Sequence, residues 1–243
     1  MTHTGSKVTV LTWLKNEEHI LPFFLRHYAF ADEIIAWDNG STDSSRRMLE
    51  ANPKVSIRDW DSGGELRDDQ LLQMKNEEYH HTGPGWKFIV DIDEFIWHEN
   101  ILMLLSMADS MGMTLLQTEG FDMVSMDLPI DDGVTPLTQI VKMGRPNPWY
   151  NKLCVVKHCC HIEYMPGAHT PRSLSGKVIV SDQPYLKLLH YRYLSRQFVM
   201  EKAKRIVLSE YNRNAQVGIT QASPLAMERK WNATWHHRIQ VLT

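Results

Sequence analysis

The sequence has few cysteines, no long apolar run and no large excess of charge of either sign. Its 243 residues include three cysteines, at positions 154, 159 and 160. These are too few and too close together for a disulfide framework, which favours a reducing compartment. No segment approaches the ~20 consecutive apolar residues of a membrane-spanning helix. Residues 1–14 lack the apolar core and the cleavage site of a signal peptide. We therefore expect a cytoplasmic protein without a membrane span.

The charge balance argues against a polyanionic partner. The chain has 26 Lys and Arg against 29 Asp and Glu, a formal net charge of -3. A protein that binds nucleic acid usually carries a clear basic excess, so we expect no nucleic-acid partner. Apolar residues make up 43% and charged residues 23%. This composition is typical of a globular chain that can bury a large core.

The first hundred residues alternate between two hydrophobic periods. Strands are predicted at residues 8–14, 33–37, 55–60 and 86–90, and helices at 17–31, 44–51 and 65–81. This alternation is typical of an α/β fold with a parallel sheet. Further along, the pattern predicts a buried helix at 101–113, a strand at 151–161 and an amphipathic helix at 196–212.

Acidic residues follow three of the predicted strands. Ligands of parallel α/β sheets bind outside the carboxyl ends of the strands, so polar side chains there are candidates for function. Asp38 and Asp59 each end a strand, and Asp91 and Asp93 follow the buried run at 86–90. On an extended segment two residues that are two apart point to one side. We therefore expect Asp91 and Asp93 to face a common Mg²⁺ or Mn²⁺, which prefer oxygen ligands.

Several motifs resemble those of one enzyme family. They are TWLKNEEHILPFFLRHY, IIAWDNGSTDSS, FIVDIDEF, PGAHTP and LLHYRYLSRQFVMEKAKR, and together they extend from about residue 8 to 205. In this order they resemble the family 2-type glycosyltransferases, in particular a bacterial subgroup with a D-x-D-E-F motif. The resemblance implies a single-domain α/β nucleotide-diphospho-sugar transferase (GT-A-like) fold with a central, mostly parallel sheet flanked by helices. Residues 1–98 would bind the nucleotide sugar, residues 99–215 would form the acceptor side, and residues 216–243 would form a tail.

The resemblance also implies roles for individual residues. Those expected to contact the donor are Lys15, Asn16, Glu17, Asp38, Asp59, Arg67, Asp68 and Asp91, with Arg192 able to neutralise the diphosphate. Asp93 would bind the metal, Asp91 would hold the ribose or a metal-bound water, and a carboxyl-terminal histidine would complete the shell. His169, in a turn-like segment, and His190, at the end of an apolar run, both remain candidates for that ligand.

The general base is left open by the sequence. Many family 2-type enzymes use a Glu-Asp pair for this task, and no such dipeptide occurs here. The candidates in the acceptor half are Asp122, Asp131, Asp132 and Glu163. The stereochemical outcome, inverting or retaining, therefore stays open as well.

The predicted activity is sugar transfer from a nucleotide-diphospho-sugar to a glycan, a lipid-linked acceptor or another hydroxyl acceptor. By analogy with the family, we expect UDP as the nucleotide and polysaccharide biosynthesis as the process. Two alternatives remain: a sugar-nucleotide hydrolase or nucleotidyltransferase using the same crevice, and a non-catalytic nucleotide- or carbohydrate-binding module. The tail carries Met227, Trp231 and Trp235 at a spacing of four. This stripe is expected to pack on the domain, on a second subunit, or on the inner face of the membrane.

Overall fold

The computed structural model describes residues 5–242, which form an α/β fold with a mostly parallel main sheet. The order of its six strands is β3-β2-β1-β4-β9-β6. Their bounds are β1 Val8–Leu14, β2 Glu33–Asp38, β3 Val55–Asp59, β4 Trp86–Ile89, β6 Leu115–Leu116 and β9 Val155–Lys157. Strands β1 to β4 are mutually parallel, and β9 and β6 extend the sheet in antiparallel pairs. The predicted fold class is confirmed.

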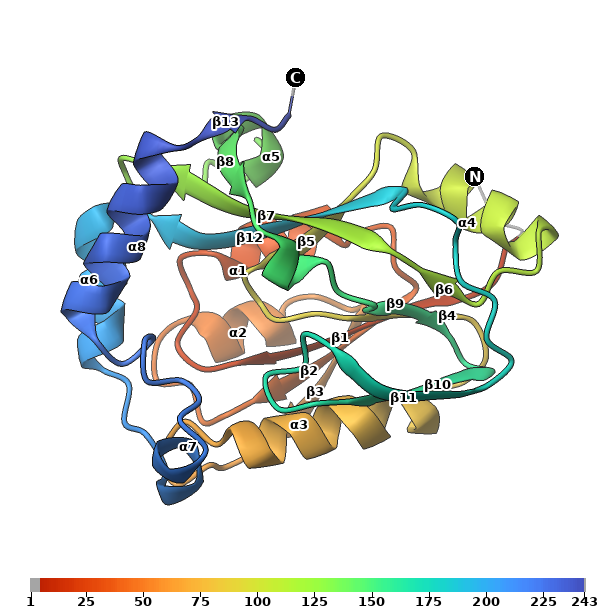
Figure 1. Ribbon diagram of the computed structural model, residues 1–243, viewed down its shortest axis with the longest axis horizontal. Helices are drawn as coiled ribbons and strands as arrows, with labels where there is room; N and C mark the ends of the chain where they lie inside the picture. Colours follow the sequence, from red (N-terminus) through yellow and green to blue (C-terminus); the bar gives the residue numbers. More distant parts are fainter. Residues whose placement is uncertain (1–4, 243) are drawn as a thin grey trace.

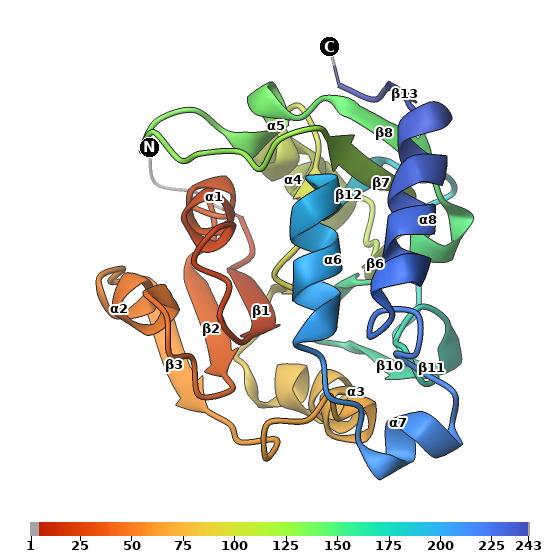
Figure 2. The ribbon, with the colours of Figure 1, turned by 90° about the vertical axis from the view of Figure 1, so that its left-hand side faces the viewer.

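Helices cover both faces of the main sheet (Figures 1 and 2). Side chains alternate between the faces of a strand. Val8 and Val10 of β1 pack with α1 (Leu21–His27) and α2 (Ser45–Glu50). Leu11 and Trp13 pack on the other face, with α3 (Asp68–Glu77) and the 3-10 turn η1 (Glu78–His81). The fully buried β1 thus has apolar residues on both faces, as expected of a central parallel strand.

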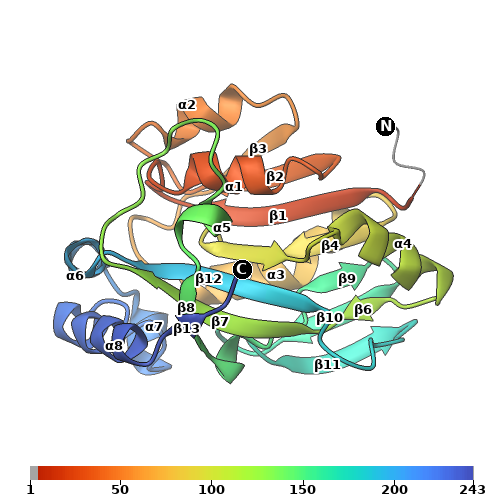
Figure 3. The ribbon, with the colours of Figure 1, turned by 90° about the horizontal axis from the view of Figure 1, so that it is seen from above.

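A second sheet, which the sequence did not predict, lies beside the first (Figure 3). Its strand order is β13-β8-β7-β12-β5. The bounds are β5 Glu94–Trp97, β7 Thr118–Ser125, β8 Met143–Pro146, β12 Leu186–Leu194 and β13 Ile239–Gln240. Strand β12 is parallel to β7 and antiparallel to β5. Because β5 follows β4 after only four residues, the turn between them joins the two sheets.

The remaining elements correct three sequence predictions. They are α4 Ile101–Ser110, α5 Leu137–Ile140, η2 Pro148–Tyr150, β10 Cys160–Tyr164, β11 Pro171–Gly176, α6 Arg196–Lys204, α7 Glu210–Asn214 and α8 Pro224–His236. The helix expected to be buried, α4, buries one side through Leu104 and Leu105 but exposes Met103 and Met107. The strand expected at 151–161 is interrupted, because the chain turns after β9 and Cys160 begins the β10–β11 hairpin.

The helix expected at 196–212 is also interrupted. It divides into α6 and α7 because the backbone between them pairs with a distant loop. The amide of Leu66 donates to the carbonyl of Val207, and the amide of Ser209 donates to the carbonyl of Leu66. Ser209 then caps α7 by accepting a hydrogen bond from the amide of Asn212. Local periodicity cannot reveal a break that a remote segment imposes.

The tail folds back onto the rest of the chain. Helix α8 lies side by side with α6 (Figure 2). Met227 and Trp231 are buried with Val199 of α6 and Tyr193 of β12. The apolar stripe of the tail therefore packs within the fold, one of the three expected settings. Within residues 5–242 no helix has the length and hydropathy needed to cross a membrane.

Candidate active site

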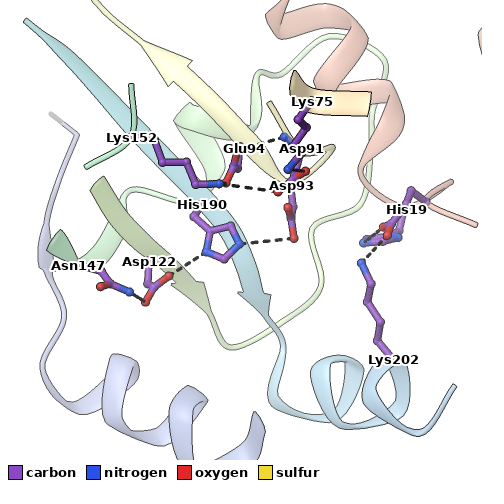
Figure 4. A network of polar contacts seen from close by, with 11 residues as sticks. His19, Lys75, Asp91, Asp93, Glu94, Asp122, Asn147, Lys152, His190 and Lys202 are labelled. Carbon is purple, nitrogen blue, oxygen red and sulfur yellow. Dashed lines mark hydrogen bonds and ion pairs between the residues drawn. The ribbon is translucent and has the colours of Figure 1, made fainter. Parts of the chain in front are cut away.

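The two acids of the D-x-D-E-F motif lie in the turn that joins the two sheets (Figure 4). The amide of Glu94 donates to the carbonyl of Asp91 at 2.9 Å, which closes the turn. The expectation that this segment is extended, which would point both side chains to one side, is therefore wrong. Asp91 and Asp93 contact different partners, and they are described separately below.

Asp91 is bound by two lysines. The ammonium of Lys75, on α3, donates to its carboxylate at 2.6 Å, and the ammonium of Lys152 lies 3.8 Å away. Lys152 also donates to Glu94, which in turn accepts a hydrogen bond from the amide of Asp91. Burial disfavours the charged carboxylate, but the charges of Lys75 and Lys152 outweigh burial and lower the pKa of Asp91. Asp91 is thus part of an alternating chain of charges rather than a free ligand.

Asp93, in contrast, has a carboxylate without a hydrogen-bond donor. Its side chain is 13% exposed, and within residues 5–242 no group donates a hydrogen bond to it. The nearest polar partner is Nε2 of His190, 3.7 Å from its Oδ2. Burial disfavours the charged form of Asp93, but His190, Lys202 and Arg192 outweigh burial and lower its pKa. A nearly buried charge of this kind is usually paired or bound to a metal.

The second sheet positions His190 beside Asp93. On β12, His190 is the register partner of Asp122 on β7 and of Glu94 on β5. Its Nδ1 lies 2.9 Å from Oδ1 of Asp122. The Oδ2 atom of Asp122 accepts a hydrogen bond of 2.7 Å from the side-chain NH₂ group of Asn147. The ring of Tyr150 stacks on the imidazole at a centroid distance of 4.1 Å. His190 is therefore held from two sides, with Nε2 directed toward Asp93 (Figure 4).

A glycine allows Tyr150 to reach this position. A Cβ on Gly120 of β7 would lie 2.4 Å from the Cβ of Tyr150. The Gly120 amide donates to the side chain of Asn151, and its carbonyl accepts from the amide of Asn147. Turn η2 therefore packs directly on the backbone of β7, which places both Asn147 and Tyr150 beside His190.

The other candidate histidine, His169, contacts two aromatic rings. It packs against Trp149 and Tyr150 at centroid distances of 5.1 and 5.0 Å. Within the described part of the chain no carboxylate lies within 4.0 Å of its ring nitrogens. Burial, reinforced by the charge of Lys152, lowers the pKa of His169 to about 3. His169 interacts with Asp91 only electrostatically, whereas the ring of His190 lies within 4.0 Å of Asp93.

Two cationic side chains approach Asp93. Arg192 interacts electrostatically with Asp93 and with Glu17. Among residues 5–242 it has no hydrogen bond or ion pair at contact distance. Lys202 of α6 donates to Glu17 at 2.6 Å. Burial outweighs that contact and raises the pKa of Glu17. These residues place positive charge close to Asp93.

The candidates that follow β1, β2 and β3 share one edge of the main sheet. Asn16 adopts a left-handed conformation, with a φ of 55°, and Lys15 beside it is exposed. Asp38 is buried and lies 3.6 Å from Arg46. Asp59 is exposed and pairs with the same arginine at 2.5 Å. The structure thus brings Asp38 and Asp59 together through Arg46.

Arg67 and Asp68 lie at the start of α3. Arg67 pairs with Asp69 at 2.7 Å and lines a surface depression of about 380 Å³. Asp68 accepts a hydrogen bond of 2.7 Å from Asn212, and it is close enough to Asp91 for an electrostatic interaction. Asp68 therefore lies near Asp91 and Lys75, while Arg67 is paired with Asp69.

Three of the four candidate bases contact neither Asp93 nor His190. Asp131 pairs with Arg26 at 2.5 Å. Asp132 accepts hydrogen bonds from Thr135 in its own loop. Glu163, on β10, pairs with Arg172 across the hairpin at 3.0 Å. The fourth, Asp122, is hydrogen-bonded to His190.

The site contains residues that the sequence analysis did not select. They are Lys75, Glu94, Asn147, Tyr150 and Lys152. Only Glu94 carried a signal, since it follows the two acids in the motif. The others come from segments far away in the sequence that the two sheets bring together.

The donor set suits a divalent cation that also binds its substrate. In residues 5–242 no group of three or more His, Cys, Asp and Glu side chains is arranged to hold a metal. Asp93 and His190 would supply two ligand atoms, one oxygen and one nitrogen. Mg²⁺ in nucleotide enzymes commonly takes one or two protein ligands and completes its shell with phosphates and water. The carboxylate of Asp93, which lacks a donor, is consistent with such a site.

Comparisons with known proteins give structural matches only. No family model matches the chain, and no curated protein matches its sequence. Among solved structures, residues 1–349 of S. aureus TarS in complex with UDP-GlcNAc align over 89% of this chain and 70% of that one, at 14% identity and a TM-score of 0.48. A longer TarS structure aligns over 86% and 41%, at 12% identity and a TM-score of 0.43. A second structure of residues 1–349 of S. aureus TarS aligns over 90% of this chain and 70% of that one, at 12% identity and a TM-score of 0.42.

Proposed function

We propose that the protein is a metal-dependent glycosyltransferase that moves a sugar from a nucleotide-diphospho-sugar to a hydroxyl acceptor. One observation carries the proposal: the nearly buried Asp93 carboxylate has no hydrogen-bond donor within residues 5–242 and faces Nε2 of His190. Asp93 follows the carboxyl end of β4, where ligands of parallel sheets bind, and His190 of β12 lies beside it. The sequence motifs that resemble family 2-type glycosyltransferases support the same reading.

The cation in this proposal is Mn²⁺ or Mg²⁺, bound by Asp93 and Nε2 of His190. When bound, it would act as a Lewis acid that stabilises negative charge on the departing diphosphate. Arg192, which has no partner of its own among residues 5–242, would add a fixed positive charge at the same place. Lys202 would exchange its contact with Glu17 for the anionic substrate.

The remaining parts of the donor would lie along the edge formed by β1 and β2. Asp38 is buried there with one carboxylate oxygen 3.6 Å from Arg46, and the other accepts from the amide of Ser41. A buried carboxylate at this edge suits a ribose or base contact. The proposal retains a UDP-sugar donor, a glycan or lipid-linked acceptor, polysaccharide biosynthesis and a cytoplasmic location.

A thermal-shift screen of UDP, GDP and dTDP sugars, with and without Mn²⁺, tests the proposal. A ligand at 100 times its Kd should stabilise the protein by about 2.7 kcal/mol. Asp93→Asn should remove the Mn²⁺-dependent part of that shift, whereas the same change at the exposed Asp182 should not. Sugars that stabilise the protein are then assayed for transfer to glycan and lipid-linked acceptors.

The outcomes separate the alternatives. Transfer to an acceptor supports the proposal. Release of free sugar at the same rate with and without acceptor indicates a hydrolase. Pyrophosphate release from a nucleoside triphosphate and a sugar phosphate indicates a nucleotidyltransferase, and Mn²⁺-dependent binding without turnover indicates a binding module. Full Mn²⁺-dependent activity of Asp93→Asn would refute the assigned metal site.

A further inference from the structure

A directed chain of hydrogen bonds connects a backbone amide to His190. The N–H of Trp149 donates to Oδ1 of Asn147 at 3.1 Å. This contact fixes the orientation of the Asn147 amide, so its NH₂ group points to Oδ2 of Asp122 at 2.7 Å. The other oxygen of Asp122 lies 2.9 Å from Nδ1 of His190. Because an ionised carboxylate only accepts hydrogen bonds, Nδ1 of His190 must carry a proton.

In the neutral imidazole, the form that binds metals, that proton determines the state of the other ring nitrogen. A neutral imidazole carries one N–H, so a proton on Nδ1 leaves Nε2 with a free lone pair. That nitrogen lies 3.7 Å from Oδ2 of Asp93. His190 and Asp122 are both buried, and Tyr150 stacks on the imidazole. The ring therefore has little freedom to turn, and Nε2 stays directed at Asp93.

We propose that Asp122 and Asn147 are positioning residues that fix the Nδ1–H tautomer of His190 and so present a bare Nε2 to the cation shared with Asp93. A carboxylate behind a metal-binding histidine orients the ring and makes it a better ligand. The inference about the cation rests on the proposed function, but the inference about the tautomer does not. It removes Asp122 from the candidate bases, since its two oxygens hold His190 and Asn147.

The substitution Asp122→Asn tests which groups donate and which accept in this chain of hydrogen bonds. Asn147 still presents its NH₂ group, so the new side chain must turn its own oxygen toward Asn147. Its NH₂ group then faces Nδ1 of His190, which becomes the acceptor, and the proton moves to Nε2. The expected variant thus has nearly the same shape and the wrong tautomer.

Exchanging the carboxylate and the amide between positions 122 and 147 should restore the natural tautomer of His190. In the double variant Asp122→Asn, Asn147→Asp, the new carboxylate accepts from the side-chain amide at position 122 and also from the amide of Trp149, a contact that aspartate makes as well as asparagine. The side-chain oxygen at position 122 then faces His190 again, and Nδ1 regains its proton. Net charge and side-chain size match the natural protein, so a purely structural role would not predict this rescue.

Two measurements decide the question. Long-range ¹H–¹⁵N spectra report which nitrogen of His190 is protonated, in the absence of metal. We expect Nδ1–H in the natural protein and in the double variant, and Nε2–H in Asp122→Asn. Mn²⁺ titrations followed by electron paramagnetic resonance, with UDP present, should show roughly 10–100-fold weaker binding in Asp122→Asn and recovery in the double variant.

Several results would overturn the inference. They are an Nε2–H or doubly protonated His190 in the natural protein, an unchanged tautomer in Asp122→Asn, or unchanged Mn²⁺ affinity in a variant whose tautomer has changed. If the natural protein shows Nδ1–H but binds no Mn²⁺, the metal part of the proposed function fails and the tautomer assignment stands. If Asp122→Asn does not fold, the spectra of the natural protein and the double variant still decide.

Discussion

Lys75 and Asp91 form a hydrogen-bonded ion pair of 2.6 Å between α3 and the turn that joins the two sheets. The side chain of Lys75 is 9% exposed and that of Lys152, the second lysine beside Asp91, is 3% exposed. Two nearly buried ammonium groups therefore depend on the carboxylates of Asp91 and Glu94. The first acid of the motif holds the turn together, and the second, Asp93, remains free for a ligand.

The two acids should accordingly respond to different extents to the same substitution. Asp91→Asn leaves Lys75 without its charged partner, and we expect a loss of about 1–3 kcal/mol of unfolding free energy. Asp93→Asn removes a charge that accepts no hydrogen bond within residues 5–242 but is stabilised by His190, Lys202 and Arg192, so we expect a smaller loss than that of Asp91→Asn. Urea unfolding of both variants in metal-free buffer measures the difference. Equal destabilisation by the two substitutions would contradict this division of roles.

Metal and nucleotide should bind cooperatively. Asp93 and His190 offer two ligand atoms, so the diphosphate and water must complete the coordination shell. We expect Mn²⁺ to bind at least ~10-fold more tightly in the presence of UDP, a coupling of about 1.4 kcal/mol, and UDP to gain the same factor from Mn²⁺. Isothermal titration in both orders measures the coupling. Tight Mn²⁺ binding that ignores the nucleotide would show that other protein ligands complete the shell.

Features of the site that depend on neighbouring residues in the sequence could be predicted, and those that depend on contacts between distant segments could not. Strands β1 to β4 have strong local patterns, so the parallel sheet and the position of Asp38 at its edge could be predicted. The geometry of the D-x-D pair could not, because two residues after β4 the chain turns to begin β5. Spacing in the sequence selected these two acids as candidates but did not predict the directions of their side chains.

The partners of those acids depend on contacts between distant segments. His190 meets Asp122 because β12 and β7 pair in one register, 68 residues apart in sequence. Lys152 reaches Glu94 across 58 residues. A one-residue shift of β12 would turn His190 to the opposite face. Hydrophobic periodicity did not reveal these two strands, and their pairing is decided by packing of the whole second sheet.

The close approach of η2 to β7 makes Gly120 a sensitive position. A methyl group there would lie 2.4 Å from the Cβ of Tyr150 and must displace the turn that carries Asn147. We expect Gly120→Ala to cost about 1–3 kcal/mol of stability and to weaken Mn²⁺ binding with UDP. Gly83→Ala is a matched control, because no atom lies within 4 Å of the added Cβ. Thermal unfolding and Mn²⁺ titration of both variants measure the effect; an unperturbed Gly120→Ala would mean that η2 does not rest on β7.

Stability should fall on mild acidification because of His27. This side chain packs against Tyr28 and Phe95, and its Nε2 lies 2.9 Å from the carbonyl of Ile96. Burial lowers its pKa to about 4, although the contact with Ile96 opposes the shift. Between this value and the ordinary pKa of about 6.5, the unfolded chain binds more protons at this position than the folded chain. The free energy of unfolding therefore rises with pH across that window. The contribution of the neutral His27 is lost as the pH falls from about 6.5 to 4.

Replacing the imidazole should flatten that dependence. His27→Gln keeps a hydrogen-bond donor but does not titrate, so the loss of stability between pH 6.5 and 4 should shrink by roughly 1–3 kcal/mol. The same substitution at the exposed His236, in the last turn of α8, should leave the pH profile unchanged. Urea unfolding at several pH values, followed by circular dichroism, gives both profiles. Parallel curves for the natural protein and His27→Gln would show that His27 titrates alike in the folded and unfolded chains.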